Sequence, residues 1–161
     1  MRTLYITRHA NTLPATGTMR DFDRRLSERG TAEASVMAER FAARKEPLDL
    51  LIASTAVRTQ ATARAFAGAL GNMKFGSAPS LYAASLETLM AIITGFPDAV
   101  RHAMLVGHNP GVSLLVDHLA GSEGTHLVPC TTVRIDLHVD HWTETAGGIG
   151  SEVWRDAPPS H

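Results

Sequence analysis

The sequence predicts a three-layer α/β/α sandwich with a mostly parallel central sheet. Short apolar segments alternate with stretches in which apolar residues recur at helical spacing, and this alternation is typical of βαβ units that cover a sheet on both faces. The chain has 161 residues, 44% of them hydrophobic, which is enough to bury a core. We therefore expect one domain over residues 1–161, with a tail that frays from about residue 157.

Two strand–helix pairs account for the first half of the chain. Residues 3–7 form a short apolar strand, and a polar loop rich in Pro, Gly, Asp and Arg follows over residues 11–25. Ser27 is placed to cap the first helix, which has one apolar stripe. The members of that stripe are Ala34, Met37, Ala38, Phe41 and Ala42. Residues 50–53 form the second strand, and its helix runs from about residue 56 to 70.

The second half continues the pattern and then changes it. An extended piece over residues 75–81 leads to a third helix, with Ser85 as its cap. Residues 103–106 form a buried strand, and we expect Asn109 to cap a fourth helix that has Pro110 at its first position.

Alternation with a period of two then appears over residues 133–139 and predicts a half-exposed strand towards an edge of the sheet. A last strand is expected near residues 152–155. The C-terminal part therefore departs from the βαβ pattern.

Composition excludes several classes of protein. The net charge is −1 and only 19% of residues are charged, so no basic stripe indicates nucleic-acid binding. No apolar run reaches the roughly 20 residues that span a bilayer, and the N-terminus has no signal-peptide pattern. We expect a cytoplasmic protein. Cys130 is the only cysteine, which excludes an internal disulfide and a thiolate-rich zinc site, and we expect it to be buried and unreactive.

Polar side chains follow three of the predicted parallel strands. They are Arg8, His9 and Asn11, then Ser54 and Arg58, then His108 and Asn109. In open α/β sheets, ligands bind outside the carboxyl ends of the strands, so these residues should meet in one crevice. Each residue alone could have a purely structural role, such as that of a core histidine or a surface arginine, but their shared location favours a functional site.

The chemistry of this set is that of phosphoryl transfer. Arginine guanidinium groups match phosphate oxygens bidentately and remain charged. A histidine with an ordinary pKa is mostly neutral at pH 7, so one ring nitrogen is free to attack phosphorus. Positioning and charge stabilisation then supply the catalysis, and this arrangement requires no metal and no cofactor.

Four motifs resemble those of the histidine phosphatase superfamily, which also contains the cofactor-dependent phosphoglycerate mutases. In order they are LYITRHANT, FDRRLSERG, LIASTAVRTQATA and LVGHNPGVSLL, over roughly residues 1 to 120. The last three resemble most closely the small SixA-like phosphohistidine phosphatases. Two departures stand out: Ala10 replaces the glycine of the wider superfamily, and Arg25 stands where proline is usual.

The resemblance implies a phosphoglycerate mutase-like fold and assigns roles to individual residues. His9 would become phosphorylated, Arg8, Arg58 and His108 would form the phosphate pocket, and Asn11 would be a further contact. The implied course is attack by His9, a phosphohistidine intermediate and hydrolysis by water. One ring nitrogen of His9 would face phosphorus while the other donates to a backbone carbonyl.

The general acid is the least defined part of the site. Glu87 lies in roughly the right region for it, but a carboxylate in the first turn of a helix also stabilises the helix dipole. Asp21 and Asp23, in the long loop, are the other candidates. A phosphohistidine substrate needs the acid least, because its imidazole is a good leaving group once the phosphorylated ring is protonated.

Four functions remain open. The first is a phosphatase for phosphohistidine in proteins, and the second is a phosphatase for a small phosphate ester or anhydride. The third is a metallohydrolase that uses some of the eight histidines, although His138 and His141 show no recognised ligand spacing. The fourth is a non-catalytic phosphate-binding module. The expected partner is a phosphorylated protein or small phosphorylated substrate, without nucleic acid or membrane.

Overall fold

A six-stranded sheet forms the centre of the protein, as a computed structural model that describes residues 1–159 shows. The strands are β1 (Arg2–Arg8), β2 (Leu50–Ala53), β3 (Gly76–Ser77), β4 (His102–Gly107), β5 (Thr132–Leu137) and β6 (Gly150–Asp156). Their spatial order is β3-β2-β4-β1-β5-β6. Strands β1 to β4 are parallel to one another, β5 pairs antiparallel with β1, and β6 pairs antiparallel with β5. The predicted mostly parallel sheet is confirmed.

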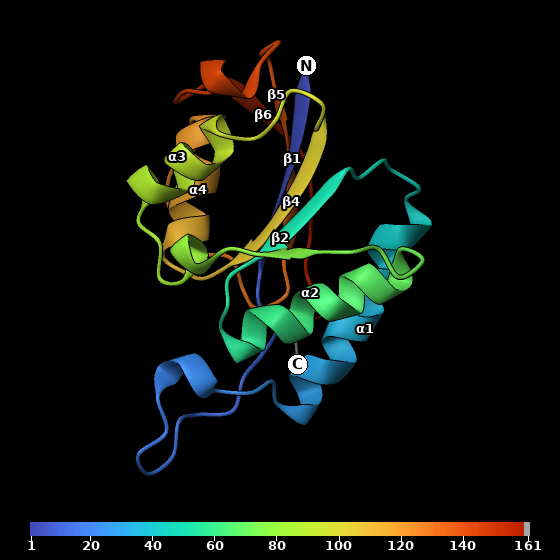
Figure 1. Ribbon diagram of the computed structural model, residues 1–161, viewed down its shortest axis with the longest axis vertical. Coiled ribbons are helices and arrows are strands. Elements are labelled where there is room, and N and C mark those ends of the chain that lie inside the picture. Colours follow the sequence, from blue (N-terminus) through green and yellow to red (C-terminus); the bar gives the residue numbers. More distant parts are fainter. Residues whose placement is uncertain (160–161) are drawn as a thin grey trace.

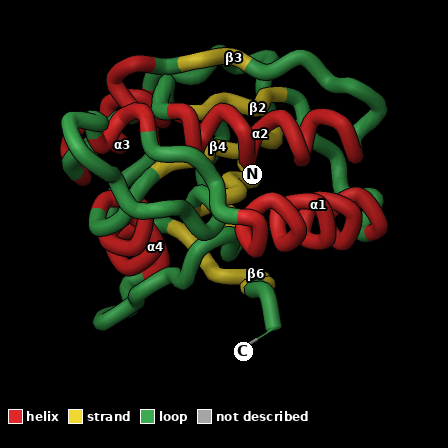
Figure 2. Tube along the Cα trace, turned by 90° about the horizontal axis from the view of Figure 1, so that it is seen from below, coloured by secondary structure: helices red, strands yellow, loops and turns green. Residues whose placement is uncertain are grey.

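Helices cover both faces of this sheet (Figure 1). They are α1 (Glu28–Ala43), α2 (Val57–Ala69), α3 (Leu86–Thr94) and α4 (Gly111–Ala120). The pair α1 and α2 lies on one face and the pair α3 and α4 on the other, and the view from below in Figure 2 shows the same separation. Each pair buries its own apolar cluster against the sheet, so the three-layer prediction is also confirmed.

The helix starts follow from local sequence in two cases and depart from it in one. Ser27 and Ser85 accept hydrogen bonds from the backbone N–H groups of Gly30 and Thr88, as expected of N-caps. Asn109 does not cap α4, because Pro110 occupies the N-cap position. The Asn109 side chain instead donates to the Leu127 carbonyl and accepts from the Ser113 hydroxyl. The predicted capping role of Asn109 is therefore wrong.

The C-terminal strands complete the sheet in the way the alternation predicts. In β5, Arg134 and Asp136 are half-buried between buried neighbours, and β6 forms the edge beyond it. The expected fraying from about residue 157 falls partly on residues 160–161, outside the described residues. Within residues 1–159, no helix is long and apolar enough to cross a membrane.

The first turn of α1 is held close to the chain that leaves β1. Gly30 is buried, and a Cβ added there would overlap the backbone carbonyl of Asn11. That carbonyl accepts a hydrogen bond from the Ser27 N–H at 3.0 Å. This close packing fixes one end of the long loop next to the carboxyl end of β1.

Candidate active site

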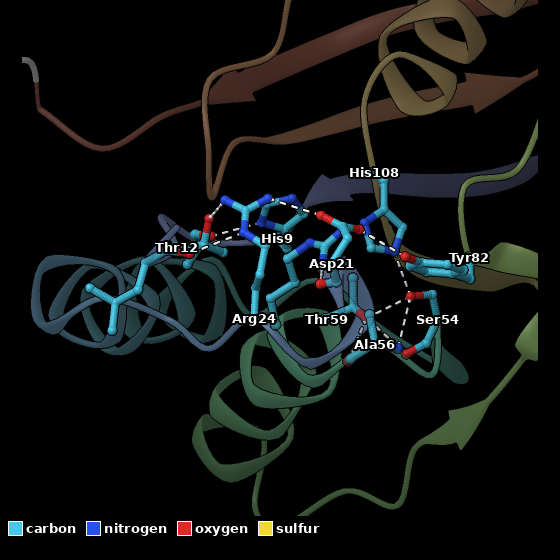
Figure 3. Close-up of polar contacts among 12 residues, drawn as sticks. His9, Thr12, Asp21, Arg24, Ser54, Ala56, Thr59, Tyr82 and His108 are labelled. Atoms are coloured by element: carbon cyan, nitrogen blue, oxygen red, sulfur yellow. Dashed lines mark hydrogen bonds and ion pairs between the residues drawn. The ribbon is translucent and has the colours of Figure 1, made fainter. Parts of the chain in front are cut away.

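A pocket of about 290 Å³ opens at the carboxyl ends of β1 and β4 and the start of α2. Its lining residues are Arg8, His9, Thr12, Asp21, Arg24, Arg58, Ala83, His108 and Asn109. They come from segments far apart in the sequence, and several are drawn in Figure 3. The sequence predicted that Arg8, His9, Arg58 and His108 meet at one place, and the structure brings them together.

His9 is held so that one ring nitrogen is committed to the backbone. Its Nδ1 lies 2.8 Å from the Ala10 carbonyl oxygen. A carbonyl only accepts, so Nδ1 carries the proton of the neutral ring and Nε2 carries the lone pair. The next peptide is fixed as well, because the Ala10 N–H donates to Thr62 Oγ1 at 3.0 Å. Burial is the main cause that lowers the pKa of His9 to about 3. His9 is therefore neutral at pH 7.

His108 is oriented by a chain of two hydroxyl groups. Thr59 Oγ1 lies 2.8 Å from the Ser54 carbonyl oxygen and 3.0 Å from that of Ala56, so its hydroxyl proton points to a carbonyl. Ser54 Oγ therefore donates to Thr59 Oγ1 and accepts from His108 Nε2, both at 2.6 Å (Figure 3). This ordering leaves the lone pair of His108 on Nδ1.

The surroundings of the His108 ring also favour its neutral form. Burial, followed by the positive charge of Arg58, lowers the pKa of His108 to about 4. Its ring lies beside that of His9, with ring centroids 5.4 Å apart, and meets the Tyr82 ring edge-on at the same separation. Two neutral imidazoles thus lie next to each other, both buried.

Arg58 and Asp21 form an ion pair across the pocket. Arg58 donates from Nη1 to the Asp21 backbone carbonyl at 2.7 Å and from Nη2 to Asp21 Oδ2 at 2.8 Å. Tyr82 donates its hydroxyl proton to the same carboxylate oxygen at 2.8 Å, and Arg24 Nη1 donates to Oδ1 at 3.1 Å. These contacts, the one from Tyr82 first, hold the pKa of Asp21 well below its usual range. Asp21 is ionised.

Arg8 is anchored to the segment before β5. Its Nη1 donates to the Leu127 carbonyl at 2.9 Å, and Asn109 Nδ2 donates to the same oxygen, also at 2.9 Å. Ser113 Oγ in turn accepts from the Leu127 N–H at 3.0 Å. Sequence reasoning had no account of residues 122–129, and the Leu127 carbonyl gives that segment a structural connection to the site.

Polar atoms without partners concentrate on residues that line this pocket. Among the described residues, five buried side-chain nitrogen or oxygen atoms have no hydrogen-bond partner. Three of the five are nitrogens: Nε of Arg8, Nε of Arg58 and Nδ1 of His108. Buried polar groups are normally paired, so unpaired ones need an explanation. An anion with several acceptor oxygens would be a suitable partner for the two guanidinium groups.

Two predicted site residues are not among those that line the pocket. Asn11 lies two residues beyond His9, but its side-chain oxygen accepts from Ser27 Oγ at 2.7 Å. Glu87 is exposed in the first turn of α3. Their assigned roles, as a phosphate contact and as the acid, stay predictions.

Sequence reasoning missed Tyr82 and Arg24 altogether and considered Asp21 only as an acid. Tyr82 directly follows the extended piece predicted over residues 75–81, but that piece was not counted among the parallel strands whose ends were searched for site residues. Arg24 lies in the FDRRLSERG motif, and its place there was the one available signal. Arg24 also donates from Nη2 to Thr12 Oγ1 at 2.6 Å, which ties the two ends of the long loop together.

Cys130 and the remaining histidines lie outside this chemistry. Cys130 is buried, and burial raises the pKa of its thiol to about 12, so the thiolate is not available as a nucleophile. Within residues 1–159, no three histidine, cysteine, aspartate or glutamate side chains are grouped as a metal site would need.

Comparison with known proteins connects this chain to one family. The sequence model of the histidine phosphatase superfamily (branch 1) matches residues 4–86 of the 161. An uncharacterized protein of Mycobacterium tuberculosis is 28% identical over 160 residues, which cover 94% of this chain and 99% of the relative. A chloroplastic protein of Arabidopsis thaliana is 26% identical and aligns with 96% of this chain and 75% of its own length.

Solved structures agree with that match over nearly the whole chain. A protein assigned as the phosphohistidine phosphatase SixA of Agrobacterium tumefaciens superposes with a TM-score of 0.85 at 28% identity, and the alignment covers 98% of each chain. The protein histidine phosphatase SixA in complex with tungstate superposes with a TM-score of 0.80 at 20% identity and covers 95% of each chain. The second likeness shows the fold alone.

Proposed function

The chain belongs to the histidine phosphatase superfamily, and from this membership we propose that it is a metal-independent protein phosphohistidine phosphatase in which His9 is the nucleophile. The observation that carries the proposal is the set of unpaired nitrogens on Arg8, Arg58 and His108 in one pocket beside a neutral His9. A phosphoryl group supplies acceptor oxygens for the two unpaired guanidinium N–H groups.

The orientation of His9 suits nucleophilic attack. With Nδ1 bonded to the Ala10 carbonyl, the lone pair on Nε2 is free to attack phosphorus. Its low pKa keeps that lone pair unprotonated at neutral pH. Attack forms the bond between Nε2 and phosphorus and breaks the bond to the leaving group. Water then attacks the phosphorylated His9, releases phosphate and restores the ring.

The two arginines and His108 would stabilise the negative charge of the transferring phosphoryl group. Arg8 and Arg58 remain charged and stabilise the negative charge on the transferring phosphoryl oxygens. His108 has its lone pair on Nδ1 while Ser54 accepts from Nε2. To donate to a phosphoryl oxygen, Nδ1 must first take up a proton, or the phosphoryl group must supply one. We therefore expect His108 to become protonated as the phosphoryl group binds.

The lack of a protonated carboxylic acid among the described residues that line the pocket favours a leaving group that needs no proton donor. Of the described residues that line the pocket, Asp21 is the one carboxylic acid, and it is ionised. A protonated phosphohistidine carries its own proton and leaves as neutral imidazole. An alkyl phosphate leaves as an alkoxide and needs a proton donor. The SixA protein of Agrobacterium tumefaciens, at 28% identity, supports the same substrate class.

The test is phosphate release from a histidine-phosphorylated protein in excess EDTA. Wild type, His9→Ala and the control His126→Ala are compared; His126 is exposed and does not line the pocket. We expect release by wild type and by the control, and none by His9→Ala. Release by His9→Ala at the wild-type rate would refute the role of His9. If none of the three proteins releases phosphate, the assay is repeated without chelator: restored release would show a metal requirement and refute the metal-independent mechanism, whereas continued absence of release would redirect the proposal to small phosphate esters.

A further inference from the structure

Asp21 occupies a position that the phosphoryl chemistry so far does not explain. It is the only carboxylate among the described residues that line the pocket. Three donors from three different segments hold it: Arg24, Arg58 and the Tyr82 hydroxyl. A carboxylate fixed by this many contacts beside a phosphate pocket opposes the binding of an anion, so its presence needs a compensating role.

The exposure of these side chains places Asp21 at the mouth of the pocket. The Arg58 side chain is 7% exposed, whereas that of Asp21 is 52% exposed. His9, the proposed nucleophile, is buried at 7% exposure. Attack and departure are roughly in line in phosphoryl transfer, so a leaving group departs on the side of phosphorus away from buried His9. That side is the mouth, where Asp21 lies; Figure 3 shows Asp21 among His9, Tyr82 and His108.

We propose that the Asp21 carboxylate contacts the leaving group and selects one that carries positive charge and an N–H, namely the protonated ring of a phosphohistidine. This inference rests on the proposed function and assigns the substrate preference to one residue. A protonated phosphoimidazole has an N–H on the ring nitrogen that is not bonded to phosphorus. Asp21 accepts from that N–H, as carboxylates do from charged donors at short distance.

The transfer step balances without any added proton donor. The His9 Nε2 lone pair forms the new bond to phosphorus, and the phosphorus–nitrogen bond of the substrate breaks. Its electron pair returns to the substrate ring, whose positive charge is thereby cancelled. The ring departs as neutral imidazole with its N–H still directed at Asp21.

The same carboxylate acts against other leaving groups. An alkyl or aryl phosphate develops negative charge on its leaving oxygen, and a fixed anion nearby raises the energy of that transition state. Asp21 cannot relieve this by donating a proton, because it is ionised in this network. The two substrate classes should therefore respond to Asp21 in different ways.

The test compares Asp21→Asn with wild type on a histidine-phosphorylated peptide and on p-nitrophenyl phosphate, whose leaving group is an anion that needs no protonation. We expect kcat/KM on the peptide to fall by about tenfold or more, the effect of one hydrogen bond to a charged group. On p-nitrophenyl phosphate we expect no loss or a gain. The inhibition constant of vanadate should stay the same or tighten, because Asn competes less for Arg58.

Two further variants keep this test decisive. Asp23→Asn is the matched control, since Asp23 lies in the same short turn but pairs with Arg20 at 2.9 Å outside the pocket. This variant should leave kcat/KM unchanged on both substrates. Tyr82→Phe removes one contact that aims the carboxylate and should shift the substrate ratio in the same direction as Asp21→Asn, by less. Tyr82→Phe therefore gives the answer if Asp21→Asn does not fold.

The outcomes separate this inference from the proposed function. Equal losses of Asp21→Asn on both substrates, with or without weaker vanadate inhibition, would show that Asp21 only orients Arg58 and would overturn the inference alone. Wild type that cleaves p-nitrophenyl phosphate but never the phosphohistidine peptide would overturn the proposed substrate and this inference together.

Discussion

His108 donates from Nε2 to Ser54 Oγ at 2.6 Å, and Ser54 Oγ in turn donates to Thr59 Oγ1. Because Thr59 points its proton at a carbonyl, the direction of the whole chain is fixed. The proton position on His108 is thus determined by two hydroxyl groups that do not line the pocket.

Ser54→Ala removes the acceptor that holds His108 Nε2–H. We expect kcat/KM to fall by about tenfold, the effect of leaving a buried donor unpaired, mostly through kcat because the arginines remain. The pH profile of kcat/KM should shift, since His108 then gains a proton at a different pH. Thr59→Val should have a smaller effect in the same direction. An unchanged pH profile in Ser54→Ala, with the protein folded, would mean that the hydroxyl chain does not orient His108.

Removing one of the proposed phosphate-binding side chains should lower activity more than removing a residue that only orients it. We expect Arg58→Ala and His108→Ala each to lower kcat by about 10²- to 10³-fold, as loss of one oxyanion donor does. Arg58→Lys keeps the charge but loses the planar fork, so it should recover only part of the activity. Steady-state kinetics with vanadate inhibition measures both effects. Near-normal rates in either alanine variant would contradict the proposed pocket.

Both pocket histidines should also make stability depend on pH. Burial lowers the pKa of His9 to about 3 and that of His108 to about 4, below the value of about 6.5 expected in the unfolded chain. Between these values the unfolded chain binds more protons than the folded one, so the free energy of unfolding decreases as pH falls from about 6.5 to 4.

The matching variant is the double substitution His9→Asn and His108→Asn. Because it lacks both rings, its free energy of unfolding should decrease less over the same pH range. Denaturant unfolding at pH 7, 5 and 4 measures the difference between the two proteins. Parallel decreases in wild type and variant would show that the buried rings do not contribute.

Local patterns were sufficient to predict most of the fold. The apolar stripes and the caps at Ser27 and Ser85 depend on residues close in sequence, and both caps formed as expected. Asn109 failed as a cap because its side chain bonds to Leu127, 18 residues away. A contact of that kind has no local signature, so the same sequence signal was right twice and wrong once.

Some residues of the candidate site could likewise be predicted from local sequence and others could not. Arg8, His9, Arg58 and His108 were predictable because strand ends and a helix start in an α/β sheet converge on one edge. Tyr82 was not, because it reaches Asp21 from a segment 61 residues further along the chain. Which carboxylate lines the pocket depends on how the long loop folds back, and composition does not encode that path.

Gly30→Ala should destabilise the loop that carries Asp21. An added Cβ would overlap the Asn11 carbonyl, so α1 and the loop must separate. We expect a loss of about 1–3 kcal/mol in the free energy of unfolding, as for other overpacked sites. Gly68→Ala is the control, because Gly68 lies inside α2 with nothing within 4 Å of the new Cβ; it should gain about 0.5–1 kcal/mol. Equal stability of the two variants would contradict the close packing at Gly30.

Glu87→Gln tests whether the carboxylate in the first turn of α3 serves as an acid. A phosphohistidine ring leaves as neutral imidazole, so we expect little change in kcat/KM on that substrate. An alkyl phosphate needs a proton for its leaving oxygen, so any contribution of Glu87 should appear there as the larger loss. If Glu87 only stabilises the helix dipole, the variant should instead lose about 0.3–1 kcal/mol of stability with both activities intact. Equal and large losses on both substrates would make Glu87 an obligatory acid and would contradict the proposal that the substrate imidazole leaves without a proton donor.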